Sequence, residues 1–327
     1  MSLNFFKVKK INYEELEAKK VSIVLCTMRK NPKLEILFES LSHQTVKNFE
    51  LVFVDELCES RKDFVKKLSE KFKIPLVHVG GAIPNIHALN IGTMNSSGDY
   101  IMHINDCGYY PYRLVEKHLL VCTNNFLSLG TRYFTHETPC FPIEKHLTAQ
   151  ISVPDKMDEN VSKYVDERSR IKEYLHLNFG EHQLTSPQDI RLLGLPADML
   201  SEDNLMLEAL PGWNHGGNSM APTSMYLDVN GYDEEYDKGY GWADCDFSVR
   251  LFNKGYKSFM NVSNWFLEIQ DKDHDPASNY VPHLESQEHI EYNSKLYDKA
   301  CGERKVWANP DFNLKEKRKE ILESRKK

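Results

Sequence analysis

Three pairs of polar residues stand directly after three apolar runs of this sequence. The pairs are Thr27 and Arg29, Asp55 and Glu56, and Asn105 and Asp106, and the runs before them cover residues 21–26, 49–54 and 100–104. Carboxylates and hydroxyls accept hydrogen bonds or bind cations, and a guanidinium pairs with anionic groups. If the runs are neighbouring parallel strands, the pairs lie together where ligands bind, beyond the carboxyl ends of the strands. Taken singly, Thr27 or Asp55 has a second interpretation as the cap of the following helix.

The first hundred residues alternate strand and helix patterns. Residues 21–26 (VSIVLC) and 49–54 (FELVFV) are nearly continuous apolar runs, as expected of strands buried on both faces of a parallel sheet. Shorter strands are predicted at 75–79 and 100–104. Helices are predicted from the apolar stripe of residues 34–41, over residues 61–72, and from Pro84 to the turn at Gly98. This α/β order predicts a doubly wound, parallel half with right-handed crossovers.

The rest of the chain has a looser pattern. Residues 138–204 are highly charged, with a polar helix predicted at 157–177, and we interpret them as a mainly helical insertion or lid. Another helix is predicted to begin at Asp244, where the positive helix end favours a carboxylate. The tail 314–327 holds seven basic and three acidic residues, which indicates a solvated terminal helix or a helix that lies on anionic lipid.

The composition argues against several classes of protein. The chain has 327 residues, of which 41% are hydrophobic and 27% charged, and its net charge of −7 argues against nucleic-acid binding by a basic surface. No apolar run approaches the roughly 18–20 residues that span a bilayer, and residues 1–10 lack the apolar stretch of a signal peptide. The seven cysteines form no C-x-x-C pair, so neither a disulfide framework nor a zinc site is indicated. We therefore expect a cytoplasmic protein.

Several segments, taken in order, resemble one enzyme family. They are residues 21–27 (VSIVLCT), 40–45, 49–55 (FELVFVD), 90–92 and 98–102, followed by 216–219 (GGNS), 230–234 (NGYDE), 241–247 (GWADCDF) and 250–256. The first group resembles the opening of family 2 glycosyltransferases of the GT-A fold. The second is similar to the galactosyltransferase-like C-terminal segment. The resemblance implies a Rossmann-like, mostly parallel central sheet flanked by helices, with a helical insertion and a C-terminal helical tail.

The resemblance also implies which residues bind the nucleotide-sugar donor. Donor-binding positions of the family match Thr27, Arg29, Asp55, Glu56, Asn90 and Asp106. A carboxylate suits a uracil N–H or a ribose hydroxyl, because these groups donate hydrogen bonds and a carboxylate accepts them. A UDP-sugar is therefore favoured. Arg29 has two interpretations, as a diphosphate ligand or as an exposed loop arginine.

One motif departs from the family pattern. The family places two aspartates, separated by one residue, after the fourth strand, where they bind Mn²⁺ or Mg²⁺. Counted from Gly98, these positions hold Asn105 and Cys107, with Asp106 between them. Either Asp106 takes over as metal ligand, or the metal is weak or absent, because cysteine is a poor substitute for a carboxylate toward a hard cation. His274 stands where relatives supply a late metal ligand, with a surface histidine as the alternative.

Asp244 matches the catalytic base of the family, which would deprotonate the acceptor hydroxyl in an inverting transfer. Ala243 replaces the glutamate that normally precedes this aspartate. The alternative is that Asp244 only caps its helix. Five residues are predicted to shape the pocket for a glycan or glycolipid acceptor, by aromatic stacking and by close backbone approach. They are Trp213, His215, Gly216, Gly217 and Trp242.

These expectations divide the chain into four parts. We predict a donor-binding half at 1–137, the insertion at 138–204, an acceptor-binding and catalytic half at 205–276, and a helical tail at 277–327. A non-catalytic relative that binds a nucleotide-sugar or a glycan is the main competing interpretation. A nucleotidyltransferase is less favoured, because residues 26–30 lack the glycines of a phosphate-binding loop. The transferred sugar, the acceptor and the linkage stay open.

Overall fold

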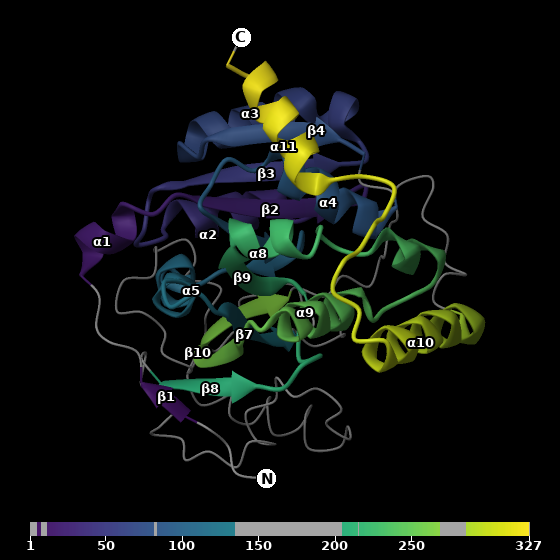
Figure 1. The fold of residues 1–327 in the computed structure, drawn as a ribbon. Coiled ribbons are helices and arrows are strands. Elements are labelled where there is room, and N and C mark those ends of the chain that lie inside the picture. The colour runs from purple at the N-terminus through teal and green to yellow at the C-terminus, as the bar shows by residue number, and fades with distance from the viewer. Residues whose placement is uncertain are drawn as a thin grey trace.

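A computed structural model describes residues 5–7, 12–81, 84–134, 205–214, 216–268 and 286–326. Within these ranges the strands form one ten-stranded sheet with the order β1-β8-β10-β7-β9-β5-β2-β3-β4, and β6 pairs with β10 off this path (Figure 1). The predicted insertion at 138–204 lies outside the described residues. The α/β fold class is confirmed.

The parallel half contains β2 (Val21–Thr27), β3 (Phe49–Asp55), β4 (Leu76–Gly80) and β5 (Tyr100–Ile104). All neighbouring pairs among these four strands are parallel, as predicted, and every residue of β3 is buried. The connecting helices are α2 (Leu34–Ser42), α3 (Cys58–Phe72) and α4 (Asn85–Asn95). Pro84 is the N-cap of α4 rather than its first residue, and α3 begins three residues before the predicted start at residue 61.

The second half of the sheet mixes strand directions. Its strands are β1 (Phe5–Lys7), β6 (Gly108–Tyr109), β7 (Leu127–Phe134), β8 (Leu205–Ala209), β9 (Asn218–Pro222) and β10 (Ser258–Glu268). Strand β9 runs antiparallel to both β5 and β7, and it joins the two halves into one sheet. Its helices are α5 (Leu114–Cys122), α8 (Thr223–Asp228), the short 3₁₀ helix η4 (Glu234–Lys238) and α9 (Ala243–Lys254). A short helix, α1 (Tyr13–Glu17), precedes β2.

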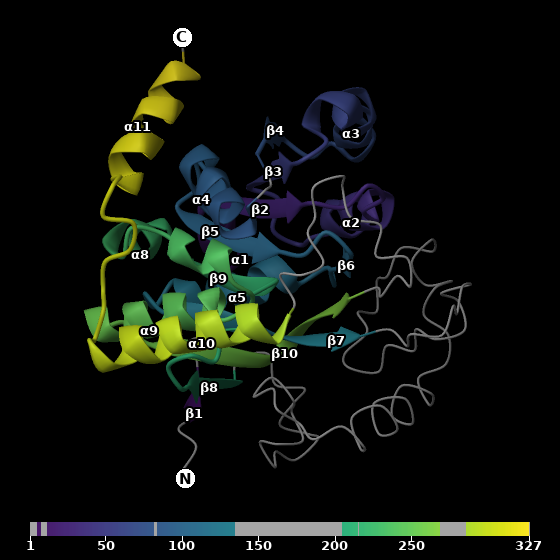
Figure 2. The same cartoon turned by 90° about the vertical axis from the view of Figure 1, so that its right-hand side faces the viewer.

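A hydrophobic core lies on each face of the sheet. Along β2, Ile23 and Leu25 belong to the first core, whereas Val24 belongs to the second, because side chains alternate along a strand. Helices α2, α3 and α5 cover the first face, and α4, α8 and α9 cover the second. Figure 2 shows α2 and α3 on one side of the strands and α4 on the other.

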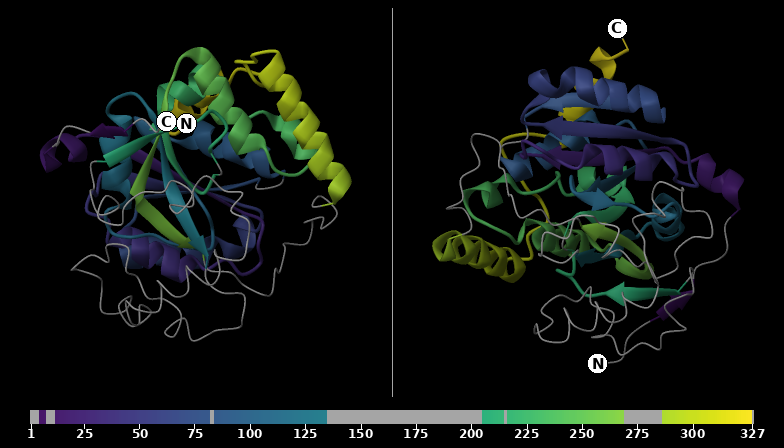
Figure 3. Two further views of the ribbon diagram at one scale, coloured as in Figure 1. Left: turned by 90° about the horizontal axis from the view of Figure 1, so that it is seen from below. Right: turned by 180° about the vertical axis from the view of Figure 1, so that it is seen from behind.

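Two helices complete the described chain, α10 (Gln287–Gly302) and α11 (Leu314–Ser324), so the predicted tail is helical. Helix α11 packs on α4, at the end of the molecule opposite β1 (Figure 3). Arg318 Nε donates to the Ser96 carbonyl over 2.9 Å, and Arg325 Nη1 donates to the Asn95 carbonyl over 2.7 Å. These arginines satisfy carbonyls that the end of α4 leaves unpaired. No helix in the described ranges combines the length and the apolar character needed to cross a bilayer.

A buried ion pair holds the segment before η4. Asp246 and Arg250 lie one turn apart on α9, are both fully buried, and pair over 2.6 Å. The Arg250 guanidinium also donates to the carbonyls of Val229 and Gly231, each over 2.9 Å. The second aspartate of the GWADCDF segment therefore has a structural role in this fold.

We predict that Arg250→Met destabilises the protein by about 3–5 kcal/mol, because it leaves the Asp246 carboxylate buried without its ion partner. Lys238→Met is the matched control, since Lys238 pairs with Glu235 over 2.7 Å on the surface. Its loss should cost at most about 1 kcal/mol. Urea unfolding of both variants measures the difference. If Arg250→Met and Lys238→Met lost the same unfolding free energy, the buried pair would contribute no more to stability than the surface pair.

Candidate active site

The structure brings together three of the predicted donor-binding residues. Thr27 Oγ1 donates to Asp106 Oδ2 over 2.5 Å, and Arg29 Nε donates to Asp106 Oδ1 over 3.2 Å. Asp106 is 8% exposed, and it follows β5, whereas Thr27 is the last residue of β2. The parallel pairing of these strands places the three side chains at one edge, as the sequence predicted.

Asp55 ends β3 at the same edge, and it is fully buried. Its Oδ1 accepts from Arg61 Nη1 over 2.5 Å and from the Leu57 amide over 2.9 Å, and its Oδ2 lies 3.0 Å from His78 Nε2. The His78 ring stacks on Phe53 with 5.0 Å between the ring centroids. Both carboxylate oxygens of Asp55 thus have protein partners.

Arg61 is a site residue that the sequence analysis missed. Its Nη2 donates to the carbonyls of Arg29 and Lys30, each over 2.8 Å, in addition to the bond from Nη1 to Asp55. It therefore ties the loop after β2 to the end of β3. The available signal was an arginine in the first turn of the helix that follows a strand ending in aspartate.

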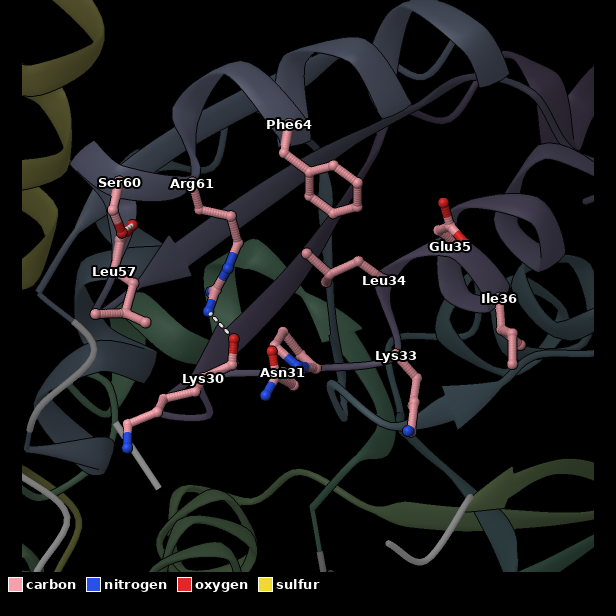
Figure 4. A pocket seen from close by; sticks show the side chains of 11 residues that line it. Lys30, Asn31, Lys33, Leu34, Glu35, Ile36, Leu57, Ser60, Arg61 and Phe64 are labelled. Atoms are coloured by element: carbon pink, nitrogen blue, oxygen red, sulfur yellow. Dashed lines mark hydrogen bonds between the residues drawn. The ribbon is translucent and has the colours of Figure 1, made fainter. Parts of the chain in front are cut away.

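A cavity of about 510 Å³ lies beside this arginine (Figure 4). Leu57, Ser60, Arg61 and Phe64 line it from the start of α3, and the segment 30–36 lines it from the opposite side. Figure 4 shows Arg61 reaching from α3 to the Lys30 carbonyl at the wall of the cavity. Glu56, which is half-buried, donates its amide to the Thr27 carbonyl over 3.2 Å. Because Arg61 lines the cavity and also pairs with Asp55, the cavity adjoins the end of β3.

Asn90 lies in α4 and is fully buried. Its Nδ2 donates to the Tyr232 carbonyl and to Glu234 Oε1, both over 2.9 Å, and its Oδ1 accepts from the Tyr232 amide over 2.9 Å. These bonds fasten residues 232–234 to α4. The structure thus shows bonds of Asn90 within the protein, and its role in donor binding stays a prediction.

Asp244 lies in the first turn of α9, and the N-cap position is held by Trp242. Its carboxylate rests against Gly216, where a Cβ atom would lie 2.6 Å from Asp244 Oδ2. At Gly217, a Cβ atom would lie 2.5 Å from Asn105 Oδ1. The two glycines have φ angles of 68° and 70°, which residues with a side chain rarely adopt. Asp244 and Asn105, which follows β5, therefore both lie against the backbone of Gly216 and Gly217.

The predicted acceptor residues have different surroundings. Trp242 is 39% exposed and stacks on Tyr297 of α10, with 5.1 Å between the ring centroids. Trp213 is half-buried and packs against the second core, and its place in the acceptor pocket stays a prediction. His215 and His274 lie outside the described residues.

The residues around Asp106 do not fit a site for Mn²⁺ or Mg²⁺. Hard divalent cations need several oxygen ligands, but both Asp106 oxygens already accept hydrogen bonds, and Cys107 is a buried thiol. In the described part of the chain, no group of three or more His, Cys, Asp or Glu side chains is placed to hold a metal ion. The predicted partner ligand His274 lies outside that part.

Two buried histidines support the sheet behind the site. His103 Nδ1 lies 3.0 Å from the Tyr232 hydroxyl, and His118 lies between Ser128 Oγ and Asn218 Oδ1 at 2.8 and 2.7 Å. Burial lowers the pKa of His103 to about 3 and the pKa of His118 to about 4. Both side chains are therefore neutral at neutral pH.

We predict that the protein loses stability as the pH falls from about 6.5 toward 3. The unfolded chain takes up protons on these histidines near their ordinary pKa of about 6.5, whereas the folded chain does not. Each histidine contributes at most about 1.4 kcal/mol per pH unit to the slope. Urea unfolding across this range measures the unfolding free energy at each pH. The slope of this free energy against pH should be smaller for His103→Gln than for wild type. The exposed His43→Gln should keep the wild-type slope, and equal slopes for all three proteins would contradict the prediction.

We predict that Gly216→Ala destabilises the protein more than Gly255→Ala does. Both glycines have positive φ angles, so each alanine strains the backbone by about 1–2 kcal/mol. Only at Gly216 does the added Cβ atom meet a side chain, because nothing lies within 4 Å at Gly255. The clash with Asp244 should cost about 1–3 kcal/mol more. Urea unfolding measures this difference, and equal losses would mean that Asp244 moves aside freely.

Known proteins resemble this chain in sequence over part of its length. Residues 208–271 match the family described as the N-terminal domain of galactosyltransferase. An uncharacterized glycosyltransferase of Bacillus subtilis strain 168, YwdF, is 29% identical over 166 residues, which are 49% of this chain and 61% of that protein. An uncharacterized glycosyltransferase of Haemophilus influenzae is 27% identical over 128 residues, which are 39% of this chain and 42% of that protein. The chain thus spans less than two thirds of either relative.

Solved structures show the same fold at low sequence identity. TarS of S. aureus (residues 1–349), in complex with UDP-GlcNAc, is 13% identical with a TM-score of 0.51, over 93% of this chain and 70% of that one. The mannosyltransferase PcManGT of Pyrobaculum calidifontis, in complex with GDP-Man and Mn²⁺, is 13% identical with a TM-score of 0.51, over 94% of this chain and 74% of that one. Over residues 208–271 this chain is therefore similar in sequence to galactosyltransferases, and its fold is similar to that of the solved glycosyltransferases TarS and PcManGT.

Proposed function

We propose that this protein transfers a sugar from a nucleotide-sugar donor to an acceptor hydroxyl. The observation that carries the proposal is the turn at Gly216 and Gly217, which packs against Asp244 on one side and Asn105 on the other. A base on α9 thereby comes next to the sheet edge where ligands of α/β folds bind. The sequence similarity to glycosyltransferases over residues 208–271 covers both Asp244 and the turn.

The donor is proposed to bind along the ends of β2, β3 and β5. A UDP-sugar is favoured by the sequence and is consistent with the UDP-GlcNAc complex of TarS. Asp55 is already held by Arg61 and His78, so we assign it the role of shaping this edge. Glu56 is the more accessible carboxylate and is proposed to accept a hydrogen bond from the ribose or the base. The adjoining cavity of about 510 Å³ is of a size that holds small ligands.

Asp244 is proposed as the general base of an inverting transfer. It takes the proton of the acceptor hydroxyl, and the acceptor oxygen forms a bond to the anomeric carbon of the donor sugar. The bond between that carbon and the diphosphate oxygen breaks, and its electron pair leaves on the diphosphate. The N-terminal end of α9 stabilises the Asp244 carboxylate before the reaction. No step of this mechanism passes through a metal ion.

The acceptor is proposed to be a glycan or glycolipid that meets the exposed face of Trp242. A sugar ring presents C–H groups that pack well on a flat aromatic surface. Trp213 and His215 keep the acceptor-binding roles expected from the sequence, and the basic tail keeps its proposed peripheral contact with a membrane. We further propose a cytoplasmic location and a role in polysaccharide synthesis. The six described cysteines are free thiols, which supports a reducing compartment.

A non-catalytic relative that binds a nucleotide-sugar or a glycan is the second candidate. The replacement of the family glutamate by Ala243 and the engagement of both Asp106 oxygens favour it. Such a relative would bind the nucleotide-sugar at the same strand ends as the enzyme, but it would not transfer the sugar. Turnover measurements therefore separate the two candidates.

We predict that Asp244→Asn lowers the rate of sugar transfer by on the order of 10²–10⁴-fold, because an amide cannot take the proton of the acceptor. Binding of UDP, measured by calorimetry, should stay within about threefold of wild type, well under the tenfold that 1.4 kcal/mol represents. The control is Asp298→Asn, an exposed carboxylate on α10. Full activity of Asp244→Asn would rule out this base, and UDP binding by an inactive wild type would favour the second candidate.

A further inference from the structure

We propose that Asn293 and Tyr297 of α10 are positioning residues of the acceptor site. They fix the two turns that carry Trp213 and Trp242. The inference rests on the proposed function, which gives both tryptophans a place at the acceptor. Helix α10 lies beside α9 in Figures 1 and 2, and the two helices are in contact.

Trp242 has an unusual backbone conformation. Its φ angle is 70°, and it follows Gly241, whose φ angle is 76°. A residue with a side chain rarely adopts such an angle, so contacts from elsewhere must hold Trp242 in place. As the N-cap of α9, Trp242 accepts a hydrogen bond from the Asp246 amide over 2.8 Å. The turn therefore sets both the direction of the Trp242 ring and the start of the helix that carries Asp244.

Asn293 holds the backbone that leads into this turn. It lies in α10 and is fully buried. Its Nδ2 donates to the Gly241 carbonyl over 2.8 Å and to the Tyr236 carbonyl over 3.0 Å. Its Oδ1 lies against Gly239, where a Cβ atom would collide with it. Both N–H groups of the amide thus bind the segment before Trp242.

Tyr297 lies one helical turn after Asn293, on the same face of α10. Its ring stacks on Trp242 with 5.1 Å between the ring centroids. Its hydroxyl lies against Gly212, which has a φ angle of 87° and where a Cβ atom would lie 2.5 Å from the oxygen. Gly212 directly precedes Trp213. One side chain therefore contacts both turns that carry the acceptor tryptophans.

The same helix face contacts the loop at a third point. The Tyr240 amide donates to the His289 carbonyl over 3.2 Å, and His289 lies one turn before Asn293. Trp242 keeps 39% of its surface exposed despite these contacts. Because Tyr297 covers one face of the ring, the rest is presented in a fixed direction. A surface that is fixed before binding loses less conformational entropy when a ligand binds, so we expect the acceptor affinity to depend on α10.

The test follows Trp242 in the full chain by acrylamide quenching of its fluorescence. The Trp242 signal is the difference between each protein and the same protein carrying Trp242→Phe. Asn293→Ser removes both hydrogen bonds and Tyr297→Leu removes the ring stack, so each should raise the quenching constant of Trp242 by about twofold. Tyr297→Phe keeps the stack and should give the wild-type constant.

Asn230→Ser is the matched control. Asn230 is also fully buried, and its Nδ2 donates to the carbonyls of Ala308 and Asn309 over 2.8 and 2.9 Å, between α10 and α11. Its replacement should lower the stability in urea but leave the quenching of Trp242 unchanged. This control separates a general loss of stability from a loss of the turn.

Sugar transfer is measured from UDP-sugars to p-nitrophenyl glycosides as acceptor probes. In Asn293→Ser and Tyr297→Leu, the KM for the glycoside should rise by about tenfold, because the fixed acceptor surface is lost. The kcat should stay within about threefold of wild type, and so should the Kd for UDP measured by calorimetry. Circular dichroism of each variant checks that it folds.

Three outcomes would overturn the inference. They are wild-type quenching of Trp242 in both Asn293→Ser and Tyr297→Leu, the same rise in quenching in Asn230→Ser, and an unchanged KM for the glycoside in variants whose Trp242 quenching has risen. If wild type neither binds UDP nor transfers sugar, the proposed function itself fails. The quenching measurements would still decide whether α10 holds the turn.

Discussion

Gly216 and Gly217 adopt φ angles of 68° and 70° just before β9, and the space at each Cα is taken by a side chain from elsewhere. Asp244 of α9 fills the space at Gly216, and Asn105 after β5 fills the space at Gly217. Only residues without a Cβ atom can bring a backbone between two side chains so closely. The position of Asp244 relative to the parallel half of the sheet depends on this turn. Asp244 and the residue that follows β5, Asn105, therefore both lie against this turn.

Two buried arginines hold the loops on which the site depends. Arg61 pairs with Asp55, and Arg250 pairs with Asp246. Each guanidinium also donates to two backbone carbonyls, of residues 29 and 30 in the first case and of residues 229 and 231 in the second. A buried charge is tolerated when it is paired and its remaining donors are bonded. The same arrangement thus pairs each arginine with a carboxylate and removes conformational freedom from a loop, although Nη2 of Arg250 has no hydrogen-bond partner among the described residues.

The carboxylate that follows β5 is already bonded within the protein. PcManGT was solved with GDP-Man and Mn²⁺, whereas the described residues of this chain offer Asp106 already bonded to Thr27 and Arg29. The charge of Asp106 is therefore balanced by a guanidinium of the protein itself. The likeness to these neighbours extends over most of the chain at 12–13% identity, so fold has persisted where side chains have changed.

The sequence by itself determined the parallel half of the sheet and the residues at its edge. Continuous apolar runs such as residues 49–54 are stable only when buried on both faces, and this requirement predicts parallel strands with helices on either side. The polar residues Thr27, Asp55 and Asp106 then follow at the strand ends, and two of these three are in direct contact. The start of α9 at Ala243, next to Asp244, was predictable from local pattern in the same way.

Only the tertiary structure decided which partner each polar side chain has. Arg61 on Asp55, Arg29 on Asp106 and Asn90 on Tyr232 join elements whose contact depends on the packing of helices against the sheet. Arg29 and Asp106 are 77 residues apart in the chain, and Asn90 and Tyr232 are 142 residues apart. Local sequence patterns report secondary structure and burial, whereas hydrogen-bond partners at such separations depend on distances that exist only after the chain has folded. For that reason the sequence located the ends of the strands, and the fold decided what their side chains bind.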